Sequence, residues 1–261
     1  MDLGLKNKTA LVLASTKGIG KGIATSLARE GCRVLISSSN TRRLDEACSQ
    51  IKNETGARVW TYTMSLNSWD SVEKGCQAIL KEHQVDIFIA NGPGPQVVDS
   101  KSINLSLLSN TLQTNLLSIV YLTNQLLPGM IDRKFGRIIH LTSTTAKEPD
   151  PGLVLSSMVR ASILAYAKTL SREIAQYGIT VNSILTGGVL TERTEALLKL
   201  SAERSQSSYD EQLKHAIESV PVGHISSPEE FSWLVTFLAS PLSSYVNGAS
   251  IPIDGGVMRG I

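Results

Sequence analysis

The stretch "TALVLASTKGIGKGIATSLARE", residues 9–30, decides the fold. It opens with six β-prone or apolar residues, turns at Gly18 and Gly20, and continues with helical periodicity to Glu30. A short apolar run followed by a longer amphipathic one predicts a strand and then a helix. The stretch therefore predicts the first β–α unit of an α/β protein.

The same alternation repeats along the chain. Further strands are expected at "RVLIS", "VWTYT", "DIFIAN", "GRIIHLTS", "GITVNSIL" and "ASIPID". Helices are expected at about 18–30, 41–54, 68–83, 107–131, 153–170 and 228–240. Strands joined by helical crossovers pair in parallel and are covered on both faces. We expect a doubly wound Rossmann fold with a mostly parallel seven-stranded sheet, formed as a single domain over residues 1–261.

Residues 187–220 interrupt this rhythm. The segment is polar and helix-prone, and it contains no evident strand. It is compatible with a substrate lid over the carboxyl edge of the sheet and equally with a surface insertion of two amphipathic helices.

Composition excludes several classes of protein. Lys and Arg number 25 against 23 Asp and Glu, a net charge of +2, so no dense basic surface for nucleic acid is expected. Cys32, Cys48 and Cys76 show no metal-ligand spacing and read as buried thiols, which fits a reducing, cytoplasmic protein without a metal. No uninterrupted apolar run approaches 18 residues and the N-terminus lacks a signal-peptide pattern, so no membrane association is expected.

The turn after the first strand is a candidate phosphate-binding site. Gly18 and Gly20 would let backbone N–H groups approach a pyrophosphate at a helix N-terminus. A glycine-rich turn can also be only a tight turn. Its position at the start of a βαβ series favours the dinucleotide interpretation.

The end of the second strand bears on which dinucleotide binds. A carboxylate is usual there when NAD is preferred, but this chain has Ser37, Ser38 and Ser39. Lys17, with Arg42 or Arg43, offers positive charge for a 2′-phosphate, so NADP(H) is favoured. The alternative is that both arginines are merely solvated on the next helix.

Taken together, these motifs resemble the short-chain dehydrogenase/reductase family, above all its 3-oxoacyl-carrier-protein-reductase-like branch. "ASTKGIG" is similar to the family's T-G-x-x-x-G-x-G turn, with Ala14 at its first Gly, and "DIFIANGPG" is similar to the strand that ends in N-N-A-G. "GITVNSILTGGVLT" resembles the loop P-G-x-x-x-T, with Thr186 in place of Pro, and "FLASPLSSYVNGASIPIDGG" resembles the C-terminal signature.

The resemblance implies a site. Asn115, Ser143, Ser156 and Arg160 stand at its catalytic positions. Cofactor-binding residues are expected at Ser15, Lys17, Gly18, Ile19, Gly20, Ser38, Ser39, Asn91, Gly92, Arg160, Gly187, Val189 and Thr191. It also implies a homotetramer built through the long helices and the C-terminal strand.

The family's central Y-x-x-x-K motif is altered here. Counting thirteen residues from Ser143 reaches Ser156, and four more reach Arg160, where Tyr and Lys are usual. Arg160 has five donors for ribose hydroxyls, but its pKa above about 12 prevents it from supplying a proton. The Ser156 hydroxyl is a far weaker acid than a phenol, and loss of general-acid help typically costs about 10²- to 10⁴-fold in rate.

The sequence contains other candidate proton donors. Tyr166 lies about 15 Å along the helix from Ser156 at a core-facing position, so Tyr166 and Lys168 are not expected to form a displaced pair. His140 is expected to point to the face opposite Ser143 and to be structural. Tyr209 or His215 of the candidate lid is a further candidate donor that would reach into the site from the lid.

Two functions fit these observations. The first is an NADP(H)-dependent oxidoreductase that reduces a carbonyl or oxidises an alcohol of a small-molecule or acyl substrate, with an atypical acid. The second is a nucleotide-binding sensor or partner subunit without turnover.

Overall fold

A single parallel sheet forms the centre of the molecule. The structure is a computed structural model and describes residues 1–260. The strands lie in the order β3-β2-β1-β4-β5-β6-β7, all parallel. They are β1 (Thr9–Val12), β2 (Arg33–Ser38), β3 (Val59–Thr63), β4 (Ile87–Ala90), β5 (Gly136–Leu141), β6 (Ile179–Thr186) and β7 (Ser250–Ile253). The predicted seven-stranded doubly wound sheet is confirmed.

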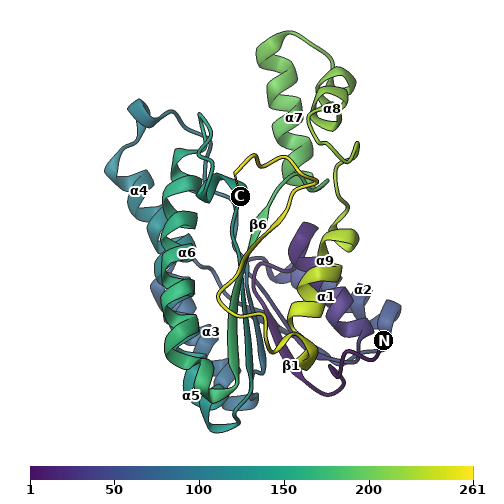
Figure 1. The fold of residues 1–261 in the computed structure, drawn as a ribbon, viewed down its shortest axis with the longest axis vertical. Helices are drawn as coiled ribbons and strands as arrows, with labels where there is room; N and C mark the ends of the chain where they lie inside the picture. Colours follow the sequence, from purple (N-terminus) through teal and green to yellow (C-terminus); the bar gives the residue numbers. More distant parts are fainter. Residues whose placement is uncertain (261) are drawn as a thin grey trace.

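Helices cover both faces of this sheet (Figure 1). They are α1 (Gly18–Arg29), α2 (Thr41–Thr55), α3 (Trp69–Glu82), α4 (Leu105–Leu112), α5 (Ser118–Asp132), α6 (Val154–Ile174), α7 (Glu192–Ser205), α8 (Tyr209–Glu218) and α9 (Pro228–Leu238). Short 3₁₀ turns lie at Ser100–Ser102, Thr144–Ala146, Ala175–Tyr177 and Pro241–Ser243. One core packs α1, α2 and α9 against the sheet, and a second packs α3, α5 and α6 against its other face.

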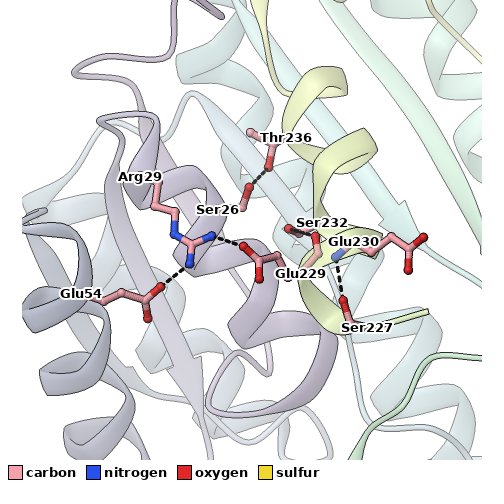
Figure 2. Close-up of polar contacts among 8 residues, drawn as sticks. All are labelled: Ser26, Arg29, Glu54, Ser227, Glu229, Glu230, Ser232 and Thr236. Atoms are coloured by element: carbon pink, nitrogen blue, oxygen red, sulfur yellow. Dashed lines mark hydrogen bonds and ion pairs between the residues drawn. The ribbon is translucent and has the colours of Figure 1, made fainter. Parts of the chain in front are cut away.

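Helices α1 and α9 lie side by side, which brings the C-terminal region against the N-terminal half of the chain (Figure 2). A side chain at Gly22 would meet the Pro228 carbonyl oxygen at 2.6 Å, so the helices approach closely because this position is glycine. Arg29 of α1 pairs with Glu229 of α9 and with Glu54 of α2, and its pKa is raised chiefly by the bond to Glu229. These contacts join α9, near the C-terminus, to the two N-terminal helices α1 and α2.

The helix expected at 107–131 differs from the prediction. The chain forms α4, a π-helical turn at Gln113–Leu117 and then α5 without a break. A π turn adds one residue to the helical repeat and often occurs at functional sites. Apolar periodicity alone did not predict it.

Residues 192–218 form a helical hairpin, α7 and α8, that projects beyond the carboxyl edge of the sheet (Figure 1). The sequence predicted either a lid or a surface insertion of two helices in this segment. A parallel β-bridge between Val189 and Ser226 joins the two chain segments that flank the hairpin. Only Ala202 of α7 is buried and α8 has no buried residue. The hairpin is thus weakly attached to the core.

Candidate functional site

The turn after β1 packs closely against Asn91, which follows β4. Ala14 adopts a left-handed φ of 47° at the position where the family has glycine. The Asn91 amide donates to the Ala14 carbonyl oxygen at 3.2 Å. A side chain at Gly20 would meet that oxygen at 2.5 Å and the Asn91 nitrogen at 2.7 Å. The glycine therefore permits the close approach of two segments of backbone.

The Ser15 hydroxyl forms two hydrogen bonds inside this turn. Its side chain is fully buried, donates to the Val12 carbonyl oxygen at 2.7 Å and accepts from the Ser37 N–H at 3.2 Å. The structure places the Ser15 hydroxyl between β1 and β2 rather than in the cleft described next.

A cleft of about 550 Å³ opens at the carboxyl edge of the sheet, where the strand order reverses between β1 and β4. Nine of the predicted cofactor-binding residues line it: Lys17, Gly18, Ile19, Gly20, Ser38, Ser39, Asn91, Gly92 and Thr191. Residues that sequence reasoning did not assign also line it, among them Thr16, Asn40, Met64, Leu66, Asn67, Thr114, Glu192 and Arg193.

The β2 end of the cleft contains hydroxyls and one guanidinium. Ser38, Ser39 and Arg43 line it together with Asn40, whose side chain caps α2 by accepting from the Arg43 N–H at 2.9 Å. Arg42 instead pairs with Glu46 one helical turn along α2. Of the two arginines left open by the sequence, Arg43 is the one that faces the cleft.

The first turn of α7 spans the mouth of the cleft. Glu192 pairs with Lys17 of the phosphate turn, and this bond lowers the pKa of the Glu192 carboxyl. Arg193 donates from its two terminal nitrogens to the Gly94 and Pro95 carbonyl oxygens, at 3.1 and 2.7 Å. Two adjacent residues of α7 therefore bind opposite rims of the cleft, and no sequence motif predicted this link.

The loop between β6 and α7 contains three predicted cofactor-binding residues, Gly187, Val189 and Thr191. Thr191 caps the helix by accepting from the Thr194 N–H at 3.3 Å, and its methyl group lies over Gly18. A side chain at Gly187 would meet the Asp254 Cα atom at 2.5 Å, so the loop packs tightly on the segment after β7. Val189 is buried beneath. Only Thr191 of the three lines the cleft.

Asn115 lies in the π turn and is buried. Its amide donates weakly to the Thr111 carbonyl oxygen at 3.4 Å, while its side-chain oxygen has no partner. That oxygen lies 3.4 Å from where a side chain at Gly92 would begin. A buried acceptor without a donor is costly, so this position suits a water or ligand N–H or O–H.

Ser143 and Ser156 are linked through Thr145. The Thr145 hydroxyl lies 2.9 Å from the Ser143 oxygen and 3.4 Å from the Ser156 oxygen. The Thr145 N–H also bonds Ser143 at 3.2 Å. The two predicted residues are therefore brought together, but with a buried third hydroxyl that sequence reasoning missed. The only sequence feature that could have indicated Thr145 is its position two residues after Ser143.

Arg160 is buried and reaches the end of β5. One terminal nitrogen donates to the Leu141 carbonyl oxygen at 2.8 Å, and burial followed by the charge of Arg193 lowers the Arg160 pKa to about 10. The guanidinium stays charged at neutral pH. Arg160 does not line the cleft, and it lies one helical turn after Ser156 on α6.

His140 lies on the face of the sheet that α6 covers. It packs edge-on to Tyr166 with ring centroids 6.0 Å apart, and neither ring nitrogen has a partner. Burial, then the nearby charge of Arg160, lowers its pKa to about 4. His140 therefore faces the helix that carries Ser156 and Arg160, and it is neutral at physiological pH.

The other candidate donors lie elsewhere. Tyr166 donates to Asn124 at 3.1 Å and Lys168 donates to the Gly248 carbonyl oxygen at 2.9 Å, so the two side chains bond to different segments. His215 lies 3.6 Å from Glu218 on the exposed side of α8, and neither it nor Tyr209 lines the cleft.

The fold and this site define a dinucleotide-binding α/β protein of the oxidoreductase type, and comparison with known proteins is consistent with that class. The family model described as enoyl-(acyl carrier protein) reductase matches residues 13–258. The chain belongs to the short-chain dehydrogenase/reductase family. Among residues 1–260 no helix is long and apolar enough to cross a membrane.

Relatives share the whole length of the chain. It is 32% identical to the "Uncharacterized oxidoreductase YvaG" of Bacillus subtilis, with all of both chains covered. It is 31% identical to the 3-oxoacyl-[acyl-carrier-protein] reductase FabG of Aquifex aeolicus, with 98% of this chain and all of the relative covered.

Solved structures share the fold closely. The L-sorbose reductase of Gluconobacter frateurii, complexed with NADPH and L-sorbose, matches with a TM-score of 0.95 and 25% identity over all of both chains. YwfH, an NADPH-dependent reductase involved in bacilysin biosynthesis, matches with a TM-score of 0.93 and 26% identity over 98% of this chain and all of that one.

Proposed function

We propose that this protein is an NADP(H)-dependent oxidoreductase that reduces a carbonyl, or oxidises an alcohol, on a small-molecule or acyl substrate. The observation that carries the proposal is the content of the cleft. A glycine-built turn lines it together with Lys17 and Arg43. Outside the lining, Thr145 links Ser143, which follows β5, to Ser156 of α6. The NADPH-dependent reductases of the same fold support it.

The residues of the cleft fit the cofactor. Gly18 and Gly20 leave backbone N–H groups open at the N-terminus of α1, which suits a diphosphate. No acidic side chain ends β2, and Ser38, Ser39 and Arg43 suit a 2′-phosphate. A bound NADPH supplies the hydride, and the protein must position the carbonyl and provide the proton.

The side chains of this chain divide those tasks. Ser143 orients the substrate oxygen by donating a hydrogen bond, and Thr145 holds Ser143 in place. Arg160 supplies a fixed positive charge beside the site, and such preorganised charge contributes several kcal/mol to many reactions. Ser156 passes a proton from water, with Asn115 steadying the water chain through its unpartnered oxygen.

A titration with NADPH, compared with NADH, tests cofactor binding and preference. We expect tighter binding of NADPH, and Arg43→Gln should remove most of the difference while Arg42→Gln should not. Turnover of a panel of ketones, aldehydes and 3-oxoacyl thioesters then tests activity. Failure of NADPH to bind would overturn the proposal.

A second candidate is a nucleotide-binding sensor or partner subunit without turnover. One observation favours it: within residues 1–260 the cleft and the hydroxyl cluster contain no tyrosine. Binding of NADPH without oxidation by any carbonyl would support this candidate. The double variant Ser156→Tyr/Arg160→Lys separates the two further, because an otherwise intact site gains activity when given a phenol.

The setting proposed is cytoplasmic, since Cys32, Cys48 and Cys76 are free and buried, and burial raises the pKa of Cys32 to about 12 and that of Cys76 to about 11. The assembly proposed is a homotetramer. Large apolar side chains are exposed on α9 and the segment before β7, and on the π turn and α6: Trp233, Leu242, Tyr245, Leu117 and Met158.

A further inference from the structure

We propose that the C-terminal segment, residues 254–260, borders the substrate beside Ser143, and that Glu148 is the positioning residue that holds this segment in place. The inference rests on the proposed function, because Ser143 is the residue proposed to orient the substrate. Neither Glu148 nor any residue of the C-terminal segment lines the cleft that fits the cofactor.

One end of the C-terminal segment is fixed beside the loop after β6. The Gly187 N–H bonds the Ile253 carbonyl oxygen at 3.0 Å, and a side chain at Gly187 would meet the Asp254 Cα atom at 2.5 Å. The Asp254 carboxylate accepts from the Gly256 and Met258 N–H groups, at 2.9 and 2.8 Å. The segment therefore leaves β7 through a hydrogen-bonded turn close to the carboxyl end of β6.

The same turn contacts the residues that follow the α7–α8 hairpin. The Val222 N–H bonds the Gly255 carbonyl oxygen at 3.2 Å. Gly255 has a left-handed φ of 66°, and a side chain there would meet Val220 at 2.5 Å and Val222 at 2.7 Å. Glycine at this position therefore lets the C-terminal segment pack against the base of the hairpin.

The other end of the C-terminal segment is fixed by Glu148. One oxygen of its carboxylate accepts from the Arg259 N–H at 2.9 Å and from the Gly260 N–H at 2.6 Å. A side chain at Gly260 would begin 3.1 Å from that oxygen, so glycine lets the carboxylate approach both donors. Hydrogen bonds to an ionised acceptor are stronger than those between neutral groups. Glu148 is therefore the anchor of this end.

Glu148 belongs to the loop that begins at Ser143. The Ala146 N–H bonds the Ser143 carbonyl oxygen, and the Glu148 N–H bonds the Thr144 carbonyl oxygen, both at 3.0 Å. The C-terminal segment thus crosses from the end of β6 to the loop after β5 (Figure 1). Ligands of doubly wound sheets bind outside this carboxyl edge. A segment fixed at both ends there restricts the space beside Ser143 in which a substrate binds.

Trypsin tests whether Glu148 holds the segment. Arg259 is exposed, and cleavage after it removes the last two residues, which intact-mass spectrometry detects. We expect Glu148→Ala to raise the rate of this cleavage about fivefold or more, because a released terminus is cut more readily than a bonded one. Asp150→Asn, at an exposed position in the same loop, is the matched control and should be cleaved as wild type. Equal rates in Glu148→Ala and wild type would overturn the inference.

Steady-state kinetics with NADPH, and with whichever carbonyl of the panel wild-type protein reduces fastest, test the role at the site. Glu148→Ala should raise the KM for the carbonyl about fivefold or more, with the Kd for NADPH within about twofold, because substrate rather than cofactor borders the segment. Glu148→Gln keeps a neutral acceptor oxygen and should fall between Glu148→Ala and wild type. Arg259→Pro removes one donor N–H without changing the Ser143 loop, so it should raise the KM as well.

The outcomes separate this inference from the proposed function. An unchanged KM in both Glu148→Ala and Arg259→Pro would overturn the inference and leave the proposed function standing. A rise in the Kd for NADPH that matches the rise in KM would also overturn it, because the segment would then act on the cofactor. Absence of turnover by wild-type protein with every carbonyl contradicts the proposed function itself.

Discussion

Ala14 occupies a left-handed backbone position between β1 and α1, with φ 47°. A non-glycine residue in this region costs about 1–2 kcal/mol of folded-state strain relative to glycine. Glycine has more conformational entropy in the unfolded chain, and losing it on folding cancels part of that gain. We expect Ala14→Gly to raise the free energy of unfolding by about 1 kcal/mol, measured by urea denaturation. Ala175→Gly, at a helical φ of −54°, is the control and should lower it by a similar amount. A loss of stability in both variants would contradict the assigned strain.

His140 makes stability depend on pH. Burial and then the charge of Arg160 lower its pKa to about 4 in the folded protein, from the ordinary value of 6.5 for an exposed imidazole, so the unfolded chain binds more protons between these values. The free energy of unfolding is therefore unaffected by His140 above pH 6.5, and it decreases as pH falls from 6.5 toward 4. The shift corresponds to about 3 kcal/mol.

Denaturation of His140→Leu and wild-type protein between pH 7 and pH 4.5 tests this. The variant should lose less stability over that range, because it has no imidazole to protonate. His215→Gln, at an exposed position on α8, should keep the wild-type pH dependence. Parallel pH profiles for wild type and His140→Leu would show that His140 does not titrate as expected.

Glu192 pairs with Lys17, which we propose binds a cofactor phosphate, so the two anions would compete for this side chain. The pair is exposed, with 46% and 62% of the two side chains accessible, so its effect is small and screened by salt. We expect Glu192→Gln to lower the Kd for NADPH about two- to fivefold in low salt. Glu195→Gln, in the same helical turn, is the control. An unchanged or higher Kd for Glu192→Gln would mean that Lys17 does not bind the cofactor.

The α7–α8 hairpin is the element most open to local unfolding. It buries one side chain in α7 and none in α8, whereas α6 buries nine. Segments with few buried contacts open at low free-energy cost. We expect amides of α7 and α8 to exchange hydrogen much faster than those of α6, and NADPH to slow exchange in the first turn of α7. Protection equal to that of α6 without NADPH would exclude a lid role.

The π turn before α5 shows how one element positions a site. The extra residue of the turn places Asn115 toward Gly92 with its oxygen free. An uninterrupted α-helix would rotate this side chain relative to the cleft. The sequence marked Asn115 as a candidate through its resemblance, but the conformation that gives it an open acceptor appears only in the structure.

At the scale of the whole molecule, the exposed apolar side chains predict assembly. Trp233 on α9 is 61% exposed and Tyr245 near β7 is fully exposed. We expect light scattering to give the mass of a tetramer, and Trp233→Glu to give smaller species. Leu200→Glu on the α7–α8 hairpin should leave the mass unchanged. A monomeric wild-type protein would contradict the proposed assembly.

The sequence by itself determined the sheet, its parallel pairing, the glycine turn after β1 and most of the predicted residues that line the cleft, because these depend on local periodicity and on glycine spacing along one β–α unit. Tertiary structure decided which distant segments meet. It placed Thr145 between Ser143 and Ser156, Arg43 rather than Arg42 at the cleft, Glu192 on Lys17, and Arg193 on the Gly94 and Pro95 carbonyl oxygens. Such contacts depend on side-chain direction and on the meeting of loops at one edge of the sheet. No pattern within a single segment encodes them.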